Sequence, residues 1–205
     1  MTPNQPPMPA SNNQMEEGDA TIVRRIRDGE VEAFRILVER HSRAMYALAH
    51  RMTGNAHDAE DIVQESLMRA YKQLDRFESR AEFGTWIHRI GVNCALDHLR
   101  SRKSREQVIQ DGGEGHEDMV ASLPAKQPSA LQQMADSQIR HHVEGALGVL
   151  SVTERSAFVM RHYQEMPLSE IGHALGINEN AVKNTIFRAV QKVRRALEPI
   201  VGDLR

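Results

Sequence analysis

Residues 58–100 read DAEDIVQESLMRAYKQLDRFESRAEFGTWIHRIGVNCALDHLR, two amphipathic segments joined by a short loop. In both segments apolar residues recur every three or four positions, the spacing that gives a helix one buried face. The first helix is expected to bury Ala59, Ile62, Val63, Ser66, Leu67, Ala70, Tyr71 and Leu74. The second is expected to bury Phe83, Trp86, Ile87, Ile90, Cys94 and Leu99. The sequence thus predicts two neighbouring helices whose polar faces are left for partners.

The polar face of the first helix is acidic near its N-terminus. It carries Asp58, Glu60, Asp61, Gln64 and Glu65. The helix dipole favours carboxylates at that end, so a solvated face explains them as well as a surface that meets a basic partner. Acid–base catalysis or a magnesium site finds no support, because the sequence around the carboxylates has no phosphate-binding glycine loop, nucleophile arrangement or ligand set.

The loop between the two helices combines aromatic and basic groups. Aromatic faces with cations nearby capture unstacked bases, and each stacked base contributes about 1–3 kcal/mol. Trp86 is ambiguous, because its spacing with Ile90 also suits the core. The candidate contacts to melted DNA are Arg76, Phe77, Arg80 and Trp86.

A helix-turn-helix pattern lies near the C-terminus. Its first helix ends at Gly176, a residue suited to the bend, and Asn178 is placed to cap the second helix. Lysine and arginine reach phosphates or guanine, asparagine pairs with adenine, and phenylalanine packs on a thymine methyl. Solvation alone would explain the basic residues of the second helix, but not the aromatic residue among them. The face expected to lie in a major groove carries Asn180, Lys183, Asn184, Phe187 and Arg188.

The run DAEDIVQE and the phrase FGTWIHRIGVNCALDHLR resemble sigma region two of the extracytoplasmic-function (ECF) group of bacterial sigma factors. The run ENAVKNTIFRA, at residues 179–189, resembles sigma region four of the same proteins. The resemblance covers residues 19–197. It implies a transcription initiation factor that binds core RNA polymerase, recognises two promoter elements and opens the downstream one.

The resemblance also implies roles for the candidate residues. Residues 58–65 are similar to the segment that docks on the clamp helices of the largest polymerase subunit. Residues 74–83 and the helix through Asn93 are similar to the part that melts and reads the minus-ten element, which adds Asn93 to the candidates. The C-terminal helix is similar to the reader of the minus-thirty-five element. Ala181 departs from the family, whose members often carry a small hydroxyl residue there, and lacks the group that would bond to phosphate.

Composition favours an all-α protein with local rather than overall affinity for DNA. The chain has 205 residues, of which 40% are hydrophobic and only 4% aromatic, as suits helical packing. The formal net charge is −2, which argues against tight unaided binding to nucleic acid. Any DNA contact must therefore come from local basic patches.

Metal chemistry and membrane insertion find no support in the sequence. Cys94 is the only cysteine, which excludes an internal disulfide and a cysteine-rich zinc site, and the ten histidines lack metal-site spacing. We expect no metal, cofactor or small-molecule substrate. No apolar run approaches the length of a membrane span, and residues 1–17 lack the features of a signal peptide. We therefore expect a cytoplasmic protein.

The rest of the chain divides into a tail, two domains and a linker. Residues 1–18, rich in proline, asparagine and glutamine, are expected to be a disordered tail. Residues 19–105 would form the first domain and residues 129–205 the second, in which Ser151 and Glu154 have the spacing of a capping box. Residues 106–128 mix glycine, proline and acids, as in a flexible acidic linker. We expect an all-α fold of two small helical domains joined by this linker, the C-terminal one a helix-turn-helix.

These patterns favour a transcription initiation factor over an enzyme. Its expected partners are core RNA polymerase, promoter DNA and an anti-sigma factor, which commonly holds ECF family members inactive. The alternative is an autonomous helix-turn-helix regulator, which would explain the C-terminal domain equally well but leaves residues 58–65 and the aromatic loop without a role. An enzyme acting on nucleotides has only the carboxylates of residues 58–65 in its favour.

Overall fold

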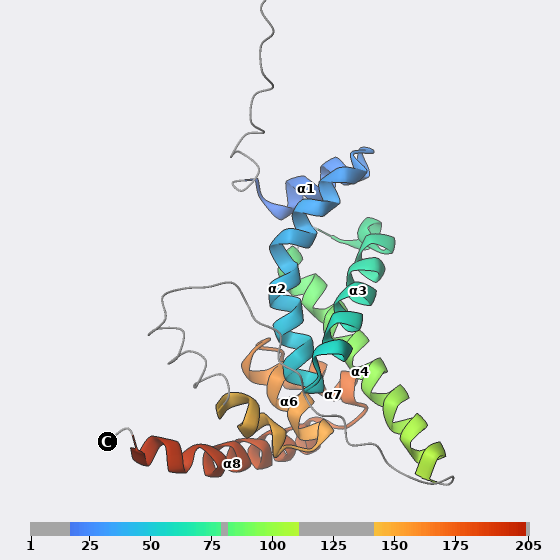
Figure 1. Cartoon of the computed structure of the whole chain (residues 1–205). Helices are drawn as coiled ribbons and strands as arrows, with labels where there is room; N and C mark the ends of the chain where they lie inside the picture. The colour runs from blue at the N-terminus through green and yellow to red at the C-terminus, as the bar shows by residue number, and fades with distance from the viewer. Residues whose placement is uncertain (1–16, 79–81, 111–141, 204–205) are drawn as a thin grey trace, which may run out of the picture.

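The computed structural model describes residues 17–78, 82–110 and 142–203, and within these ranges its regular structure is helical (Figure 1). The first group of helices comprises α1 (Asp19–Arg27), η2 (Val31–Ala33), α2 (Phe34–Thr53), α3 (Ala56–Lys72), η3 (Leu74–Arg76) and α4 (Phe83–Gln110). The second group comprises helical residues 142–148, α6 (Val152–His162), α7 (Leu168–Leu175) and α8 (Glu179–Asp203). The predicted all-α class and the helix-turn-helix formed by α7 and α8 are confirmed.

Two glycines end helices in the left-handed backbone region, which glycine enters most readily. Gly54 follows α2 with a φ of 72°, and Gly176 follows α7 with a φ of 68°. The second of these turns separates α7 from α8. Asn178 then caps α8, because its Oδ1 accepts a hydrogen bond from the backbone N–H of Ala181 at 2.8 Å. The predicted turn and cap are therefore confirmed.

Aromatic rings fill the core of the first group of helices. Phe83 of α4 and Leu37 of α2 are at most 2% exposed, and they belong to one apolar cluster. Phe77, just before α4, is 3% exposed, and its ring centroid lies 5.4 Å from those of Phe83 and Trp86. This cluster fixes the start of α4 against α2.

Two aromatic residues lie elsewhere than the sequence predicts. Tyr71, predicted in the buried face of α3, is 41% exposed, because it lies at the edge of the apolar stripe with its ring against Phe34. Phe77, predicted at the surface to stack on a base, is buried. The chain turns inward at η3, where the N–H of Phe77 donates to the carbonyl of Leu74 at 3.1 Å, and the ring closes the core over Phe83.

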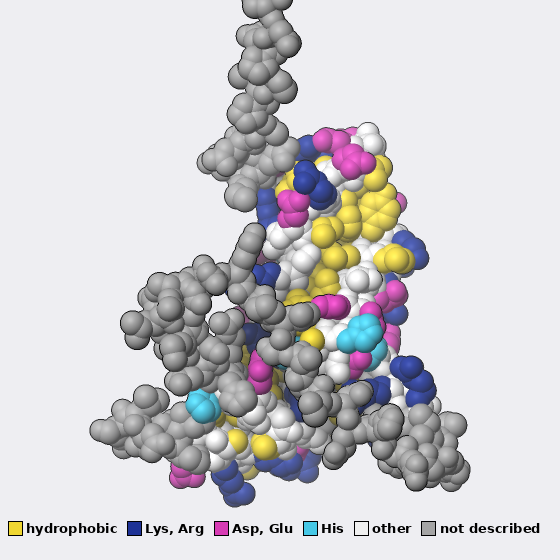
Figure 2. All heavy atoms as spheres, viewed as in Figure 1, with side chains coloured by type: hydrophobic (Ala, Val, Ile, Leu, Met, Phe, Trp, Pro, Cys, Tyr) yellow, Lys and Arg dark blue, Asp and Glu magenta, His cyan; other side chains and the backbone are white. Residues whose placement is uncertain are grey.

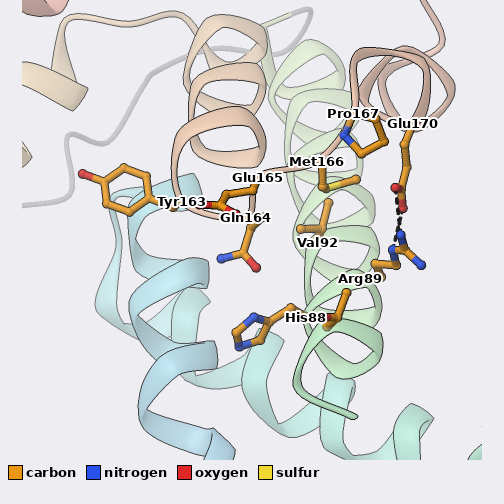
Figure 3. A pocket seen from close by; sticks show the side chains of 10 residues that line it. His88, Arg89, Val92, Tyr163, Gln164, Glu165, Met166, Pro167 and Glu170 are labelled. Atoms are coloured by element: carbon orange, nitrogen blue, oxygen red, sulfur yellow. Dashed lines mark hydrogen bonds and ion pairs between the residues drawn. The ribbon is translucent and has the colours of Figure 1, made fainter. Parts of the chain in front are cut away.

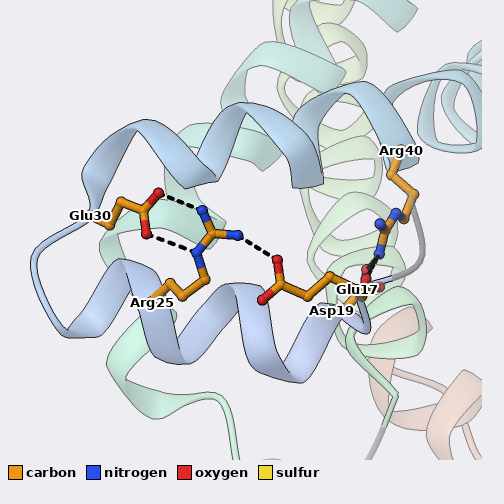
Figure 4. A network of polar contacts seen from close by, with 5 residues as sticks. All are labelled: Glu17, Asp19, Arg25, Glu30 and Arg40. Atoms are coloured by element: carbon orange, nitrogen blue, oxygen red, sulfur yellow. Dashed lines mark hydrogen bonds and ion pairs between the residues drawn. The ribbon is translucent and has the colours of Figure 1, made fainter. Parts of the chain in front are cut away.

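Charged side chains fix α1 to its neighbours (Figure 4). Arg25 of α1 binds Glu17 and Glu30, and its Nε donates to Glu30 Oε2 at 2.8 Å. The hydrogen bond from Arg25 lowers the pKa of the Glu30 carboxyl. Arg40 of α2 binds Asp19 at the start of α1. These ion pairs supplement the apolar contacts of α1 and anchor the first described residues to α2.

The two groups of helices pack against each other, although residues 111–141 separate them in sequence. α6 packs against the end of α2 that is nearest α8 (Figure 1). Both α6 and α7 also contact α4. One apolar cluster contains Met52 of α2 and Val92 of α4 together with Met160 of α6 and Met166. Each of these four residues is at most 7% exposed. The sequence predicted two domains and a linker, but it did not predict this contact.

α4 extends further than the sequence predicts. Residues 106–128 are predicted to be linker, whereas α4 continues to Gln110. Nothing in residues 101–110 stops a helix, since the first glycine comes at Gly112. The rest of the predicted linker and residues 1–16 of the predicted tail lie outside the described ranges.

Candidate nucleic-acid interface and partner surface

One side of α8 is exposed near its N-terminus. Val182 and Ala189, on the opposite side, are fully buried, which fixes the helix within its domain. Phe187 is 64% exposed, so its ring takes no part in the core. We call the exposed side the α8 face; it consists of the five residues predicted to read DNA, Asn180, Lys183, Asn184, Phe187 and Arg188.

Polar contacts with α6 position α8. Ser151 and Glu154 form the predicted capping box, in which each side chain accepts a hydrogen bond from the backbone N–H of the other, at 3.3 and 3.0 Å. Glu154 Oε2 also accepts a hydrogen bond from Lys192 Nζ of α8 at 2.7 Å. The pKa of the Glu154 carboxyl lies below its ordinary value, chiefly because of Lys192. The α8 face therefore rests on a fixed pair of helices.

One acidic residue of α3, Asp58, is bound to the neighbouring helix α4. Asp58 lies 3.1 Å from His98 Nε2 and 3.3 Å from Arg102 Nη1, so its carboxylate joins α3 to α4. Glu65 accepts a hydrogen bond from Arg69 Nε at 2.7 Å but stays at the surface. The acidic-run residues that are exposed to solvent are Glu60, Asp61, Gln64 and Glu65.

Hydrophobic side chains continue this exposed surface along α3. Met68 is 53% exposed and Tyr71 41% exposed. Met68 follows Gln64 by four residues and Glu65 by three, and Tyr71 follows Met68 by three, spacings that place residues on one side of a helix. Figure 2 shows hydrophobic side chains gathered between α2 and α3 at the end nearest α1. Sequence reasoning missed this apolar part, because Tyr71 has the spacing of a core residue.

This combined surface is called the α3 face below. Exposed apolar patches bordered by charge are typical of interaction sites. The α3 face consists of Glu60, Asp61, Gln64, Glu65, Met68 and Tyr71.

The described residues predicted to contact melted DNA lie at the end of η3 and along the first half of α4. Arg76 is exposed at the end of η3, and Asn93 is exposed on α4. Trp86 is half-buried, with its ring centroid 5.4 Å from those of Phe77 and Phe83. Arg80 lies outside the described residues. Arg76, Trp86 and Asn93 are therefore accessible, whereas Phe77 supports Trp86 from the core.

A cavity of about 260 Å³ lies between α4 and the segment that joins α6 to α7 (Figure 3). His88 and Val92 line it from α4, and Gln164 and Met166 line it from the other side. Burial lowers the pKa of His88, and nearby His41 lowers it further. Among the described residues, none offers a hydrogen-bond partner to His88 Nε2. The cavity thus marks an imperfectly packed part of the contact between the two groups of helices.

The described ranges contain neither a metal-binding cluster nor a membrane-spanning helix. Among these residues, no group of three or more histidine, cysteine, aspartate or glutamate side chains could hold a metal ion. Over the same residues, no helix has both the length and the apolar character needed to cross a membrane.

Comparison with known proteins matches both groups of helices to one family. Sigma-70 region 2 matches residues 37–105, and Sigma-70, region 4 matches residues 141–193. The ECF RNA polymerase sigma factor SigW of Bacillus subtilis is 29% identical over 180 residues, which cover 87% of this chain and 96% of SigW. The RNA polymerase sigma-H factor of Pseudomonas aeruginosa is 28% identical over 191 residues, which cover 92% of this chain and 98% of that protein.

A solved structure shares the fold. The sigma factor RpoE of Bartonella quintana, crystallised in complex with the anti-sigma factor NepR, has a TM-score of 0.58 and 23% sequence identity to this chain. The superposition covers 80% of this chain and 96% of RpoE. The likeness therefore extends over both groups of helices.

Proposed function

The chain belongs to the ECF group of RNA polymerase sigma factors, and from this premise we propose that it binds core RNA polymerase, directs it to specific promoters and helps to open the DNA. The observation that carries the proposal is the presence in one chain of the α8 face and the α3 face. An autonomous regulator needs the first surface but has no use for the second.

The α8 face is proposed to read the minus-thirty-five element. Lys183 and Arg188 supply the positive charge that phosphates or guanine acceptors require, and Asn180 and Asn184 supply amides that can pair with adenine. Phe187 offers an apolar surface to a thymine methyl. The buried opposite side of α8 lets these groups enter a major groove without moving the core.

The α3 face is proposed to dock on core polymerase. Glu60, Asp61, Gln64 and Glu65 are exposed and suit a basic partner surface, and the adjoining apolar side chains add area that is removed from water on binding. Asp58 is proposed to act indirectly, because its carboxylate is held by α4.

The start of α4 is proposed to melt and read the minus-ten element. Arg76, Arg80 and Asn93 would contact the separated strand, and Trp86 would present its exposed edge to an unpaired base. Phe77 contributes by holding Trp86 in place.

We further propose that the chain carries out no chemistry of its own, needs no cofactor and works in the cytoplasm, where its polymerase partner is found. An anti-sigma factor is proposed as a third partner, because RpoE of Bartonella quintana, which shares the fold, was crystallised with one.

Run-off transcription tests the proposal. Purified chain and bacterial core polymerase are combined on a template that carries the promoter of the chain's own operon, with a scrambled promoter and core polymerase alone as controls. A specific transcript that requires both proteins is expected. Protection of the same DNA by the chain alone, without any dependence on polymerase, would instead favour an autonomous regulator.

A further inference from the structure

Arg27, the last residue of α1, binds the segment that follows α3. Its Nη2 donates hydrogen bonds to the carbonyl oxygens of Leu74 and Phe77, each at 2.6 Å. Its Nε lies 4.0 Å from Oδ1 of Asp75. Hydrogen bonds from a charged donor are about twice as strong as those between neutral groups. One guanidinium therefore ties η3 and the residue after it to α1.

The two carbonyls lie on either side of Arg76 in sequence. Phe77 has left the helical conformation, with a φ of −68° and a ψ of 109°, so its carbonyl points away from the hydrogen bonding of η3. Arg27 supplies a donor to that carbonyl from another helix. The backbone is thus held on both sides of Arg76, whose side chain is exposed.

α1 is a fixed support for Arg27. Ile22 and Ile26 of this helix are at most 8% exposed and belong to the core of the first group of helices. His41 of α2 binds the start of α1, with its Nε2 2.8 Å from Oδ2 of Asp19. Because both ends of α1 are held in this way, the position of α2 determines where Arg27 places η3.

The effect of Arg27 extends to Trp86 through a ring. Phe77 is 3% exposed, and its ring centroid lies 5.4 Å from that of Trp86. Phe83 supports Trp86 from a second side at the same distance. Trp86 is half-buried, so its orientation depends on these two rings. A shift of the Phe77 backbone would leave one side of Trp86 without support.

We propose that Arg27 is a positioning residue for promoter opening. It holds the backbone around Arg76 and, through Phe77, the ring of Trp86, so that both side chains meet unpaired bases in a fixed geometry. Groups that are ordered before binding lose less freedom when they bind. Arg27 itself does not contact DNA in this role. The inference rests on the proposed function, since it requires Arg76 and Trp86 to contact melted DNA.

Fluorescence of the free chain tests the positioning directly, because Trp86 is the only tryptophan. Arg27→Ala is expected to shift the emission to longer wavelength and to increase quenching by acrylamide, since the ring becomes more exposed. The matched control Arg24→Ala removes an exposed arginine from the same helix and is expected to change neither. A variant that had only lost stability would keep the emission of the parent under native conditions, and circular dichroism shows whether its helices are intact.

Transcription with core polymerase tests the consequence for opening. Each chain is assayed on a duplex promoter and on the same template with mismatched bases that leave the minus-ten region unpaired. Arg27→Ala is expected to lower run-off transcription from the duplex by roughly tenfold, as for the loss of one stacked base. It is expected to keep most of the transcription from the unpaired template and the parent's affinity for core polymerase.

Two further variants test the route through Phe77. Phe77→Leu keeps an apolar side chain in the core but removes the ring, and it is expected to reproduce both the emission shift and the loss on the duplex. Combining it with Arg27→Ala should add little, because residues that act by one route are not additive. Arg27→Lys keeps a charged donor on a shorter side chain, so it is expected to fold and to show smaller changes of the same kind even if Arg27→Ala unfolds.

The outcomes separate the inference from the proposed function. Unchanged Trp86 emission in Arg27→Ala, equal losses on the two templates, or independent losses in the double variant would overturn the positioning role even if the parent chain transcribes. Failure of the parent chain to transcribe from either template would overturn the proposed function, and with it a role for Arg27 in opening. Shifted emission together with a loss confined to the duplex would support both.

Discussion

Arg188 lies on the α8 face, where the one hydrogen bond that it makes to another described side chain is long, 3.5 Å from its Nη2 to Thr185 Oγ1. Arg188→Ala should therefore leave the fold intact while it removes a contact to base or phosphate. Such contacts contribute about 1–3 kcal/mol to binding. Run-off transcription at limiting protein should fall, and the circular dichroism spectrum should be unchanged.

The matched control for this change is Arg194→Ala. Arg194 is exposed on the same helix, but it lies six residues, about 9 Å along the helix axis, beyond Arg188 and outside the α8 face. The Arg194→Ala variant should retain nearly full run-off transcription. Equal transcription by the wild-type chain and Arg188→Ala would remove Arg188 from the DNA-reading residues.

His88 gives the contact between the domains a dependence on pH. Its pKa is lowered from 6.5, first by burial and then by His41 on α2, while Gln164 partly offsets the shift. Arg89, Glu165 and Glu170 also face the same cavity. The folded state thus favours the neutral imidazole, so the unfolded chain takes up the proton more readily as the pH falls below 6.5.

The free energy of unfolding should consequently decrease between pH 7.5 and pH 5.5, and part of the decrease should be absent in His88→Asn. Urea unfolding of both proteins at the two pH values measures the difference. If the two proteins lost the same free energy of unfolding, His88 would not be the group responsible.

Among the helical elements, the turn between α7 and α8 depends on the backbone conformation of one glycine. Gly176 has a φ of 68° and no atoms near the position that a Cβ would take, so Gly176→Ala adds strain but no clash. The left-handed conformation costs about 1–2 kcal/mol for a residue with a Cβ. The free energy of unfolding should fall by that amount in chemical denaturation.

The opposite result is expected for the same substitution within a helix. Gly145 lies in helical residues 142–148, is exposed and has open space around it. Gly145→Ala should raise the free energy of unfolding by about 0.5–1 kcal/mol, because alanine is the better helix former. Changes of the same sign in both variants would contradict the assigned backbone conformations.

α3 presents a partner surface that charge reversal can test. Asp61 lies on the α3 face with 55% of its side chain exposed. Asp61→Lys should weaken binding to core polymerase by roughly three- to tenfold, as expected when an exposed pair becomes repulsive. Glu39→Lys, exposed on α2, makes the same change outside the α3 face. Similar affinities for both variants in a pull-down titration would argue against docking through α3.

The elements themselves were largely predictable from sequence, because local signals determine their ends. Asn178, the Ser151 capping box and Gly176 each act through bonds or backbone angles within a few residues. The two aromatic corrections have a different origin. Spacing identifies the apolar side of α3, but not how far the core extends across it, so the exposure of Tyr71 could not be predicted. The inward turn that buries Phe77 depends on the neighbouring rings.

At the scale of the whole molecule, the contact between the domains could not be predicted. Arg89 and Glu170 are 81 residues apart, and each taken alone has the pattern of a solvated charge. The composition of the linker predicted only that the domains are separate units. The arrangement of the DNA-reading residues relative to one another therefore comes from the structure, whereas their chemical types are evident in the sequence.

The charge of the whole chain leads to a prediction that distinguishes a polymerase-dependent factor from an autonomous regulator. The net charge is −2, and the α8 face carries only two cations, Lys183 and Arg188. Each phosphate neutralised contributes about −0.9 to the slope of log affinity against log salt, so two contacts give a slope of about −2. The free chain should bind promoter DNA only in the non-specific range, with a Kd of about 10⁻⁴–10⁻⁶ M.

Fluorescence anisotropy of a labelled promoter duplex over a series of salt concentrations measures both quantities, with and without core polymerase. Polymerase should convert this weak binding into specific binding, because it holds the two domains at fixed separation and their contacts then add through effective concentration. Nanomolar, steeply salt-dependent binding by the chain alone would mean that its own surfaces suffice for recognition, as in an autonomous regulator. Weak binding alone and tight binding with polymerase would mean that the two DNA-reading surfaces work only when polymerase spaces them.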